Sequence, residues 1–236
     1  MNPTDGVISE AFDLYKKHFG HLVVVALVIY LAIAILGVLL VLIAGWVGAI
    51  LVAILAVVGA FLVQAALVEA VADIRDGRAD MTVGETLNRG LSRIASVAGA
   101  SILAGLAIGI GLLLLIVPGL VLITWWAVII PVIVLEHVGT FDSFGRSREL
   151  VRGFDFQVFG VIVLQFLILL AFTIVLAIIL APFPEEVSSF LSNVVSGAFT
   201  GPFAALVSTL LYFRLKAAKE GPGVPPGPTA PPPAVS

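Results

Sequence analysis

Residues 22–68 form an unbroken run of 47 residues without a charged side chain. A helix needs about 20 apolar residues, at ~1.5 Å rise per residue, to cross a hydrocarbon core ~30 Å thick. The run therefore predicts two membrane spans, 22–43 and 47–72, joined by a turn at AGWVG, where Trp46 suits the membrane interface. Hydrocarbon offers no hydrogen-bond partners to an open backbone, so we expect each span to be helical.

Four more spans are predicted from the remaining apolar stretches, which are broken at VPGL and at APFPEE. Their ranges are 94–117, 119–136, 157–181 and 187–213. The composition agrees, because 61% of the residues are hydrophobic and only 11% are charged, against about 25% in a soluble domain. We expect an all-α integral membrane protein with six transmembrane helices in three hairpins.

The basic residues indicate the orientation of these spans. All twelve lie before the first span, between the second and third, between the fourth and fifth, or after the sixth. They are Lys16, Lys17, Arg75, Arg78, Arg89, Arg93, Arg146, Arg148, Arg152, Arg214, Lys216 and Lys219. With six spans these four regions share one face, and the positive-inside rule places it, with both termini, in the cytoplasm. On the opposite face we expect only the charges of Glu185 and Glu186.

A short amphipathic segment precedes each predicted hairpin, and the three form a weak internal repeat. Their sequences are VISEAFDLYKKHFGHL in the N-terminal segment 1–21, TVGETLNRGLSRIASV, and TFDSFGRSRELVRGF. Apolar residues recur in them at helical spacing, and Thr82 with Glu85 forms a capping-box motif. These patterns predict three cytoplasmic helices that lie along the lipid headgroups.

The two ends of the chain frame a membrane domain that we expect over residues 22–220. The first twenty residues carry acidic side chains before the apolar run, which is not the pattern of a signal peptide. Residues 221–236 are rich in proline, which predicts a disordered or partly polyproline tail. That tail is interpreted as solubilising, with a ligand for a proline-recognition domain as the alternative.

Four stretches together resemble a known family. They are ISEAFDLYKKHFGHL, VPGLVLITWWAVIIPVIVLE, FDSFGRSRELVRG and LLYFRLKAAKEG. Over about residues 7–221 the chain resembles the bacterial six-span proteins grouped as the membrane domain of glycerophosphoryl diester phosphodiesterase. The resemblance implies a multi-pass protein of the bacterial cytoplasmic (inner) membrane, tied to lipid or envelope biology. This chain has neither the length nor the His/Glu clusters for the phosphodiesterase domain itself, so the enzymatic activity is not carried over.

Charged residues are concentrated between residues 134 and 154. Glu136 and His137 are expected at the cytoplasmic end of the fourth span, either as boundary residues or as part of a site. Arg146, Arg148 and Arg152 form the densest basic cluster, which we interpret either as a topology signal or as a contact with a lipid headgroup or phosphate. Arg148 and Arg152 stand one helical turn apart, so they are placed to share one phosphate.

Polar and small residues within the spans suggest helix contacts. Gln64, Glu69 and Gln165 are candidates for interhelical hydrogen bonds or for a polar cavity. Two G-x-x-x-G motifs, Gly105/Gly109 and Gly197/Gly201, allow close helix packing, either within the chain or between two copies. Pro131 and Pro202 are expected to kink their helices, and Trp125 and Trp126 to fill the bundle.

Several functions find no support in the residues. The chain has no cysteine, three scattered histidines, a net charge of −3, and no nucleophile–base pair, phosphate loop or zinc motif. We therefore expect no catalytic site, cofactor, metal or nucleic-acid partner. The leading hypothesis is a lipid-associated structural or accessory membrane protein, whose partners are membrane lipids. The alternatives are a transporter or channel-like carrier of a lipid or small molecule and, third, a membrane-embedded enzyme acting on lipid phosphates.

Overall fold

A computed structural model describes residues 2–75 and 81–221 of the chain, and within them it is all-helical. The helices are α1 (Val7–Arg75), α2 (Val83–Leu114), α3 (Ile116–Trp125), α4 (Ile129–Glu136), α5 (Thr140–Val151), α6 (Asp155–Leu180) and α7 (Glu185–Glu220). The fold class predicted from the sequence is thus confirmed as all-α. The predicted Pro-rich tail, apart from Gly221, and Arg78 lie outside the described residues.

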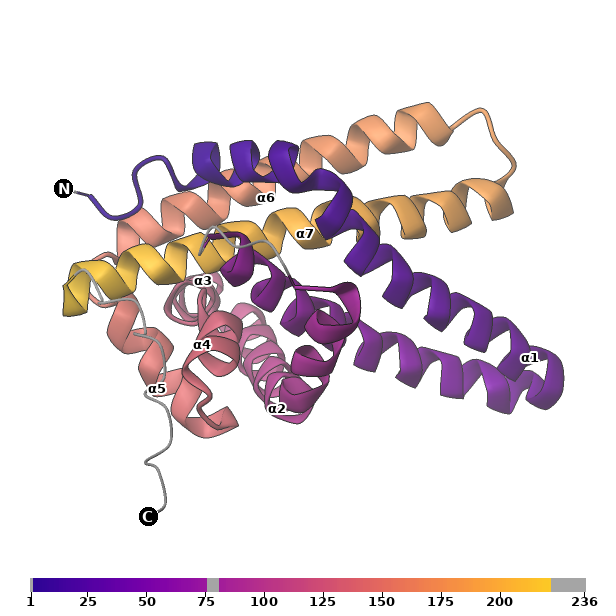
Figure 1. Ribbon diagram of the computed structural model, residues 1–236, viewed down its shortest axis with the longest axis horizontal. Coiled ribbons are helices and arrows are strands. Elements are labelled where there is room, and N and C mark those ends of the chain that lie inside the picture. The colour runs from indigo at the N-terminus through magenta and orange to yellow at the C-terminus, as the bar shows by residue number, and fades with distance from the viewer. Residues whose placement is uncertain (1, 76–80, 222–236) are drawn as a thin grey trace, which may run out of the picture.

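Helix α1 is two arms of a hairpin. Its 69 residues would measure about 100 Å if straight, several times the thickness of a hydrocarbon core. Gly45 breaks it with φ 55° and ψ −126°, a conformation that glycine adopts without steric cost, and the second arm returns beside the first (Figure 1). The turn predicted at AGWVG is therefore confirmed. A second break at His18 separates the amphipathic residues 7–17 from the first arm.

Helix α2 begins at the predicted capping box. The Thr82 hydroxyl accepts a bond from the Glu85 backbone N–H at 3.3 Å, and the Glu85 carboxylate accepts one from the Thr82 N–H at 2.9 Å. The prediction of a separate interfacial helix here is wrong, because α2 continues without a break to Leu114. The segment has no proline to stop the helix, so it runs directly into the apolar stretch. The third predicted amphipathic segment forms the separate helix α5, and its position along the headgroups stays a prediction.

The predicted fourth span is divided into α3 and α4. The chain turns from α2 into α3 at Leu115, in extended conformation, two residues before the predicted break at VPGL. A second interruption, at residues 126–128, precedes Pro131. Proline has no N–H to donate to the carbonyl four residues earlier and clashes with it, so the helix breaks one turn before it. The expected kink in this span is a full break.

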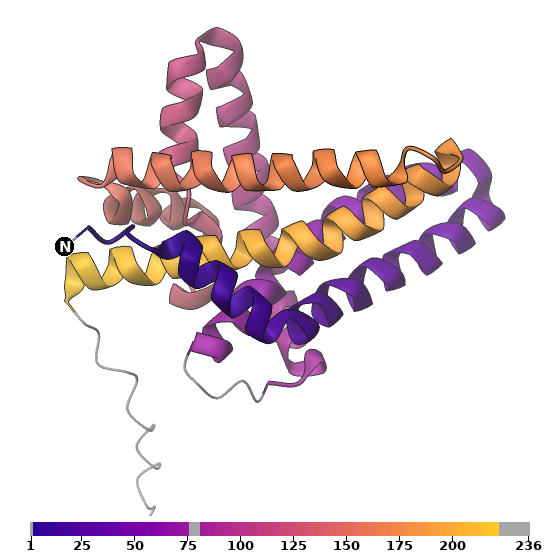
Figure 2. The same ribbon diagram turned by 90° about the horizontal axis from the view of Figure 1, so that it is seen from above.

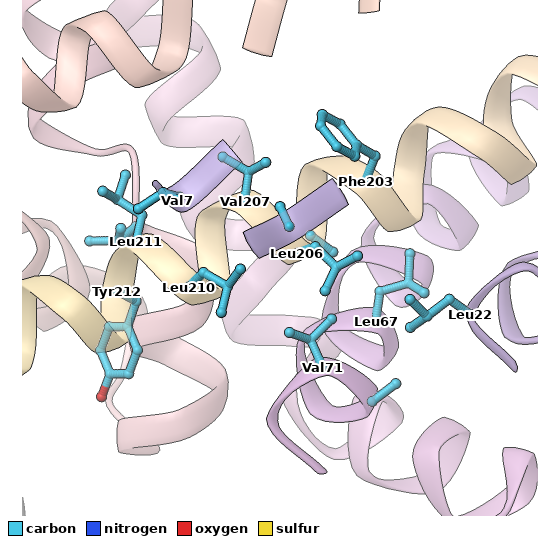
Figure 3. Close-up of a cluster of buried hydrophobic side chains, with 14 of the residues drawn as sticks. Val7, Leu22, Leu67, Val71, Phe203, Leu206, Val207, Leu210, Leu211 and Tyr212 are labelled. Atoms are coloured by element: carbon cyan, nitrogen blue, oxygen red, sulfur yellow. The ribbon is translucent and has the colours of Figure 1, made fainter. Parts of the chain in front are cut away.

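The hydrophobic core lies around the C-terminal half of α7. Leu206, Leu210 and Leu211 are almost completely buried there against Leu22 and Leu67 from the two arms of α1 (Figure 3). Phe203 and Tyr212 extend the same buried row along α7. Helix α7 is therefore the element against which both arms of α1 pack, and it continues through Pro202 as a single helix.

The hairpins formed by α1 and by α6 with α7 extend in one direction, whereas the α2–α3 hairpin projects another way (Figures 1 and 2). Its tip is strongly exposed and apolar, with Leu113 at 88% and Ile116 at 69% exposure. Five helical stretches of the described chain are long and apolar enough to cross a membrane: α1, 84–114, 116–136, 155–180 and 195–220. They are compatible with a multi-pass membrane protein.

Candidate functional site

Glu136, the last residue of α4, is the centre of a charged cluster. Its carboxylate accepts two hydrogen bonds from Arg146, at 2.7 Å from Nε and 3.0 Å from Nη2. The Tyr212 hydroxyl and the Lys216 ammonium each donate to Oε1 at 2.9 Å, and Lys216 also lies 3.0 Å from the Tyr212 oxygen. The side chain of Glu136 is only 12% exposed, so these bonds replace most of its hydration.

Arg146 connects this carboxylate to two others. It pairs with Glu149 at 3.1 Å on its own helix, α5, and with Glu220 at the end of α7. The bonds to Glu136, Glu220 and Glu149 raise the pKa of Arg146 above its usual value. We call Glu136, Arg146, Glu149, Tyr212, Lys216 and Glu220 the Glu136 cluster. It joins α4, α5 and α7 at one end of the molecule.

The geometry of the Glu136 cluster favours a structural role. Four donated hydrogen bonds occupy the Glu136 carboxylate, which leaves it poorly placed to accept a proton from a substrate or to bind a metal. His137, its neighbour in sequence, lies outside the cluster. His137 ends α4 at φ 60°, is exposed, and places its Nδ1 2.7 Å from the Val134 carbonyl. The structure does not bring Glu136 and His137 together as one site.

Arg148 and Arg152 are separated from Arg146 and are exposed. The Arg148 guanidinium lies 4.0 Å from the centre of the Trp125 ring, in cation–π geometry. Arg152 follows α5 directly, and its N–H donates to the Arg148 carbonyl at 2.9 Å. Trp125 in turn donates from Nε1 to Asp155 at 3.1 Å. We call Trp125, Arg148, Arg152 and Asp155 the cationic corner.

A groove of about 460 Å³ begins at this corner and lies between α3 and α6. Its walls are mainly Leu120 and Val121 from α3 and Phe156 and Phe159 from α6. The sequence did not indicate this role for Trp125, which was expected only to fill the bundle. That expectation assumed a continuous fourth helix. The interruption after Trp125 places the indole beside α5 instead, where the Ser147 hydroxyl donates to the Trp125 carbonyl at 2.9 Å.

The polar residues predicted within the spans occupy two different places. Gln64 and Gln165, from α1 and α6, line one cavity of about 310 Å³ together with Ser208 and with Pro131. Glu69 lies elsewhere, at 3.8 Å from Arg89 of α2. The side chain of Glu69 is 11% exposed, and the exposed Arg89 offsets part of the cost of burying it at the contact between α1 and α2.

The two G-x-x-x-G motifs differ in their surroundings. A Cβ at Gly197 would lie 2.9 Å from the Tyr30 ring, and one at Gly201 would touch Leu67, so this motif packs within the chain. Apart from the backbone of α2 itself and the adjacent residues, no atom of the described residues lies within 4 Å of a Cβ at Gly105 or Gly109. Self-association through that second pair stays a prediction.

Comparison of the chain with protein-family models, with curated proteins and with solved structures finds no match. The resemblance to the phosphodiesterase membrane domain therefore stays an expectation drawn from the quoted sequence stretches.

Proposed function

We propose that this chain is a non-catalytic integral membrane protein of the bacterial cytoplasmic membrane, with a lipid-associated structural or accessory role. It crosses the membrane six times when the two arms of α1 are counted separately, and both termini lie in the cytoplasm. The Glu136 cluster fixes the cytoplasmic ends of α4, α5 and α7 to one another, and the cationic corner contacts lipid headgroups.

The observation that carries this proposal is the exposure of Arg148 and Arg152 next to apolar surface that is also exposed. Phe156 is 89% exposed one residue beyond the Asp155 of the corner, and Leu167 on the same helix is 52% exposed. Such an apolar surface is stable in hydrocarbon and unfavourable in water. Arginines at its edge are then at the depth of anionic headgroups, where each contributes ~1 kcal/mol of attraction.

A membrane-embedded enzyme is less well supported. Its active site would have to use Glu136, His137 and the arginines, but Glu136 and Arg146 satisfy each other and His137 faces elsewhere.

The lipid role is tested by the lipids that co-purify with the protein in mild detergent. We expect the double variant Arg148→Ala/Arg152→Ala to retain several-fold less anionic phospholipid than the wild type. The matched control Lys16→Ala/Lys17→Ala removes the same charge from two exposed lysines of α1. Equal lipid content in both variants would contradict a specific contact. Arg146 is left intact, because its removal would break the Glu136 cluster.

A second candidate, a transporter of a small polar molecule, is favoured by the cavity lined by Gln64 and Gln165. The break between α3 and α4 borders it through Trp126 and Ala127, and interrupted helices beside a binding cavity are a recurrent feature of transporters. Liposomes containing the protein would then swell faster than empty liposomes in small neutral solutes, and Gln64→Leu would remove the difference. Equal swelling rates would exclude this candidate for the solutes used.

A further inference from the structure

We propose that the groove between α3 and α6 binds one acyl chain of an anionic phospholipid, whose phosphate contacts Arg148 and Arg152. This inference rests on the proposed membrane location and names the lipid class and the site. It depends on three features: the apolar walls of the groove, the polar chemistry at one end of it, and the surface to which it opens.

The walls are suited to a hydrocarbon chain. Leu120 and Val121 from α3 face Phe156 and Phe159 from α6, and the lining is overwhelmingly apolar. The volume of about 460 Å³ lies in the usual range of small-molecule sites, ~300–1,000 Å³. An apolar chain in this groove buries side chains that otherwise remain open, which is favourable in proportion to the area covered.

The end of the groove at Trp125 supplies the groups that bind a phosphate. Stacking on the indole orients the Arg148 guanidinium, whose N–H donors match phosphate oxygens. Arg152 lies one turn further along the chain, at the end of α5. In the described part of the chain neither arginine has an ion pair within 4.0 Å, in contrast to Arg146 with its three carboxylates.

The balance of charge favours an anionic lipid over a zwitterionic one. Lys219 adds a third positive charge near this end, with its Nζ 5.8 Å from the Phe154 ring. The opposing carboxylate at the groove is Asp155. Its two oxygens already accept bonds from the Trp125 indole at 3.1 Å and from the Gly153 N–H at 2.9 Å. Asp155 therefore stabilises the cationic corner through these two bonds. The remaining positive charge attracts a phosphate but repels the ammonium group of a choline or ethanolamine headgroup.

The groove opens onto apolar surface that belongs to the same helices. Val117 is 70% exposed at one end of α3, and Phe166 is 62% exposed further along α6. The groove is open at this surface, so a lipid chain reaches it without displacing a helix.

Fluorescence quenching by brominated lipids tests the site directly, because Trp125 is part of it. The variants Trp46→Phe and Trp126→Phe leave Trp125 as the sole tryptophan of the full chain. Trp126 packs edge-to-face on Phe144 at 4.8 Å, so a phenyl ring preserves much of that contact. The protein is reconstituted into phosphatidylcholine vesicles that contain increasing fractions of phosphatidylglycerol brominated on one acyl chain, or of phosphatidylcholine brominated in the same way.

We expect brominated phosphatidylglycerol to quench Trp125 at a several-fold lower fraction than brominated phosphatidylcholine. Arg148→Ala or Arg152→Ala should each raise the half-quenching fraction about five-fold, which corresponds to ~1 kcal/mol. Val121→Phe, which fills the groove, should lower the maximal quenching. Each curve is normalised to the same variant in vesicles without bromine. Lys17→Ala, an exposed cation far along the chain, serves as the control and should change nothing.

Identical curves for the two brominated lipids would overturn the proposal, because the groove would then contact lipid without selecting it. The proposal would also be overturned if both arginine variants weaken the quenching while Val121→Phe leaves it unchanged. The headgroup would then bind without an acyl chain in the groove. Alkaline extraction of the membranes tests separately whether the protein is embedded in the membrane. If the wild-type protein is released at high pH, the proposed function itself is contradicted, and not only the lipid site.

Discussion

At the scale of single residues, the decisive side chain is Glu136. The sequence placed it at the end of a predicted span but gave no sign of its partners. Arg146, Tyr212 and Lys216 lie 10, 76 and 80 residues away in the chain, and contacts at such separations depend on how the helices pack. The same holds for the ion pair between Arg214 of α7 and Glu10 of α1, 204 residues apart. That Glu136 ends a helix was predictable, whereas its pairing was not.

We predict that Glu136→Gln destabilises the protein by about 2 kcal/mol. Arg146 and Lys216 then lose the charged carboxylate that they share, and both are partly buried. For comparison, breaking a fully buried ion pair costs ~3–5 kcal/mol. The smaller value reflects the 23% and 37% exposure of Arg146 and Lys216. Thermal unfolding in detergent measures the loss as a lower Tm.

Glu149→Gln is the matched control for that variant. It removes a carboxylate from the same arginine, but Glu149 is 68% exposed and its pair spans one helical turn. Exposed pairs of this kind contribute about 0.5 kcal/mol or less. Equal losses of stability in the two variants would contradict a central role for Glu136 in the cluster.

At the scale of helices, the length of the apolar runs predicted where the long helices lie. The same runs did not predict where a helix is continuous and where it is interrupted. Charge-free runs long enough to cross a membrane predicted where the long helices lie, and Gly45 turns the chain within the predicted AGWVG. The split of the fourth span was only partly foreseen. Pro131 was expected to kink it, but a proline does not reveal whether the helix bends or breaks. Because it breaks, Trp125 contacts α5, and the cationic corner could not be predicted from residue spacing along one helix.

The α2–α3 hairpin depends on a close approach at Gly119. A Cβ there would lie 2.8 Å from the Leu112 backbone nitrogen, which cannot move as a flexible side chain can. We predict that Gly119→Ala destabilises the protein by about 1–3 kcal/mol, the usual cost of overpacking. In Gly105→Ala the new Cβ meets open space, so the helix should gain up to ~1 kcal/mol. Thermal unfolding of both variants in one detergent compares them, and a lower Tm for Gly105→Ala alone would contradict this account of the hairpin.

At the scale of the whole molecule, the distribution of charge and of apolar surface defines the proposed role. The basic segments contact one another through the Glu136 cluster and through Arg214 with Glu10, around the C-terminal half of α7. The tips of the hairpins carry exposed apolar residues instead, such as Leu42 and Leu114 at 77% and 75% exposure. The separation of the Lys and Arg segments from the apolar runs was visible in the sequence. The different direction of the α2–α3 hairpin was not, because hydropathy carries no information about packing angle.

Six spans with both termini in the cytoplasm can be probed by single-cysteine labelling, since the natural chain has no cysteine. Cysteines replace Trp46, Leu115 or Phe183 at the three tips, and Ser9 or Thr140 on the proposed cytoplasmic side. A membrane-impermeant maleimide added to intact cells should label the three tip variants, and should label the other two only after permeabilisation. If Leu115→Cys, like Thr140→Cys, is labelled only after permeabilisation, the middle hairpin does not cross the membrane. That result would contradict the six-span topology.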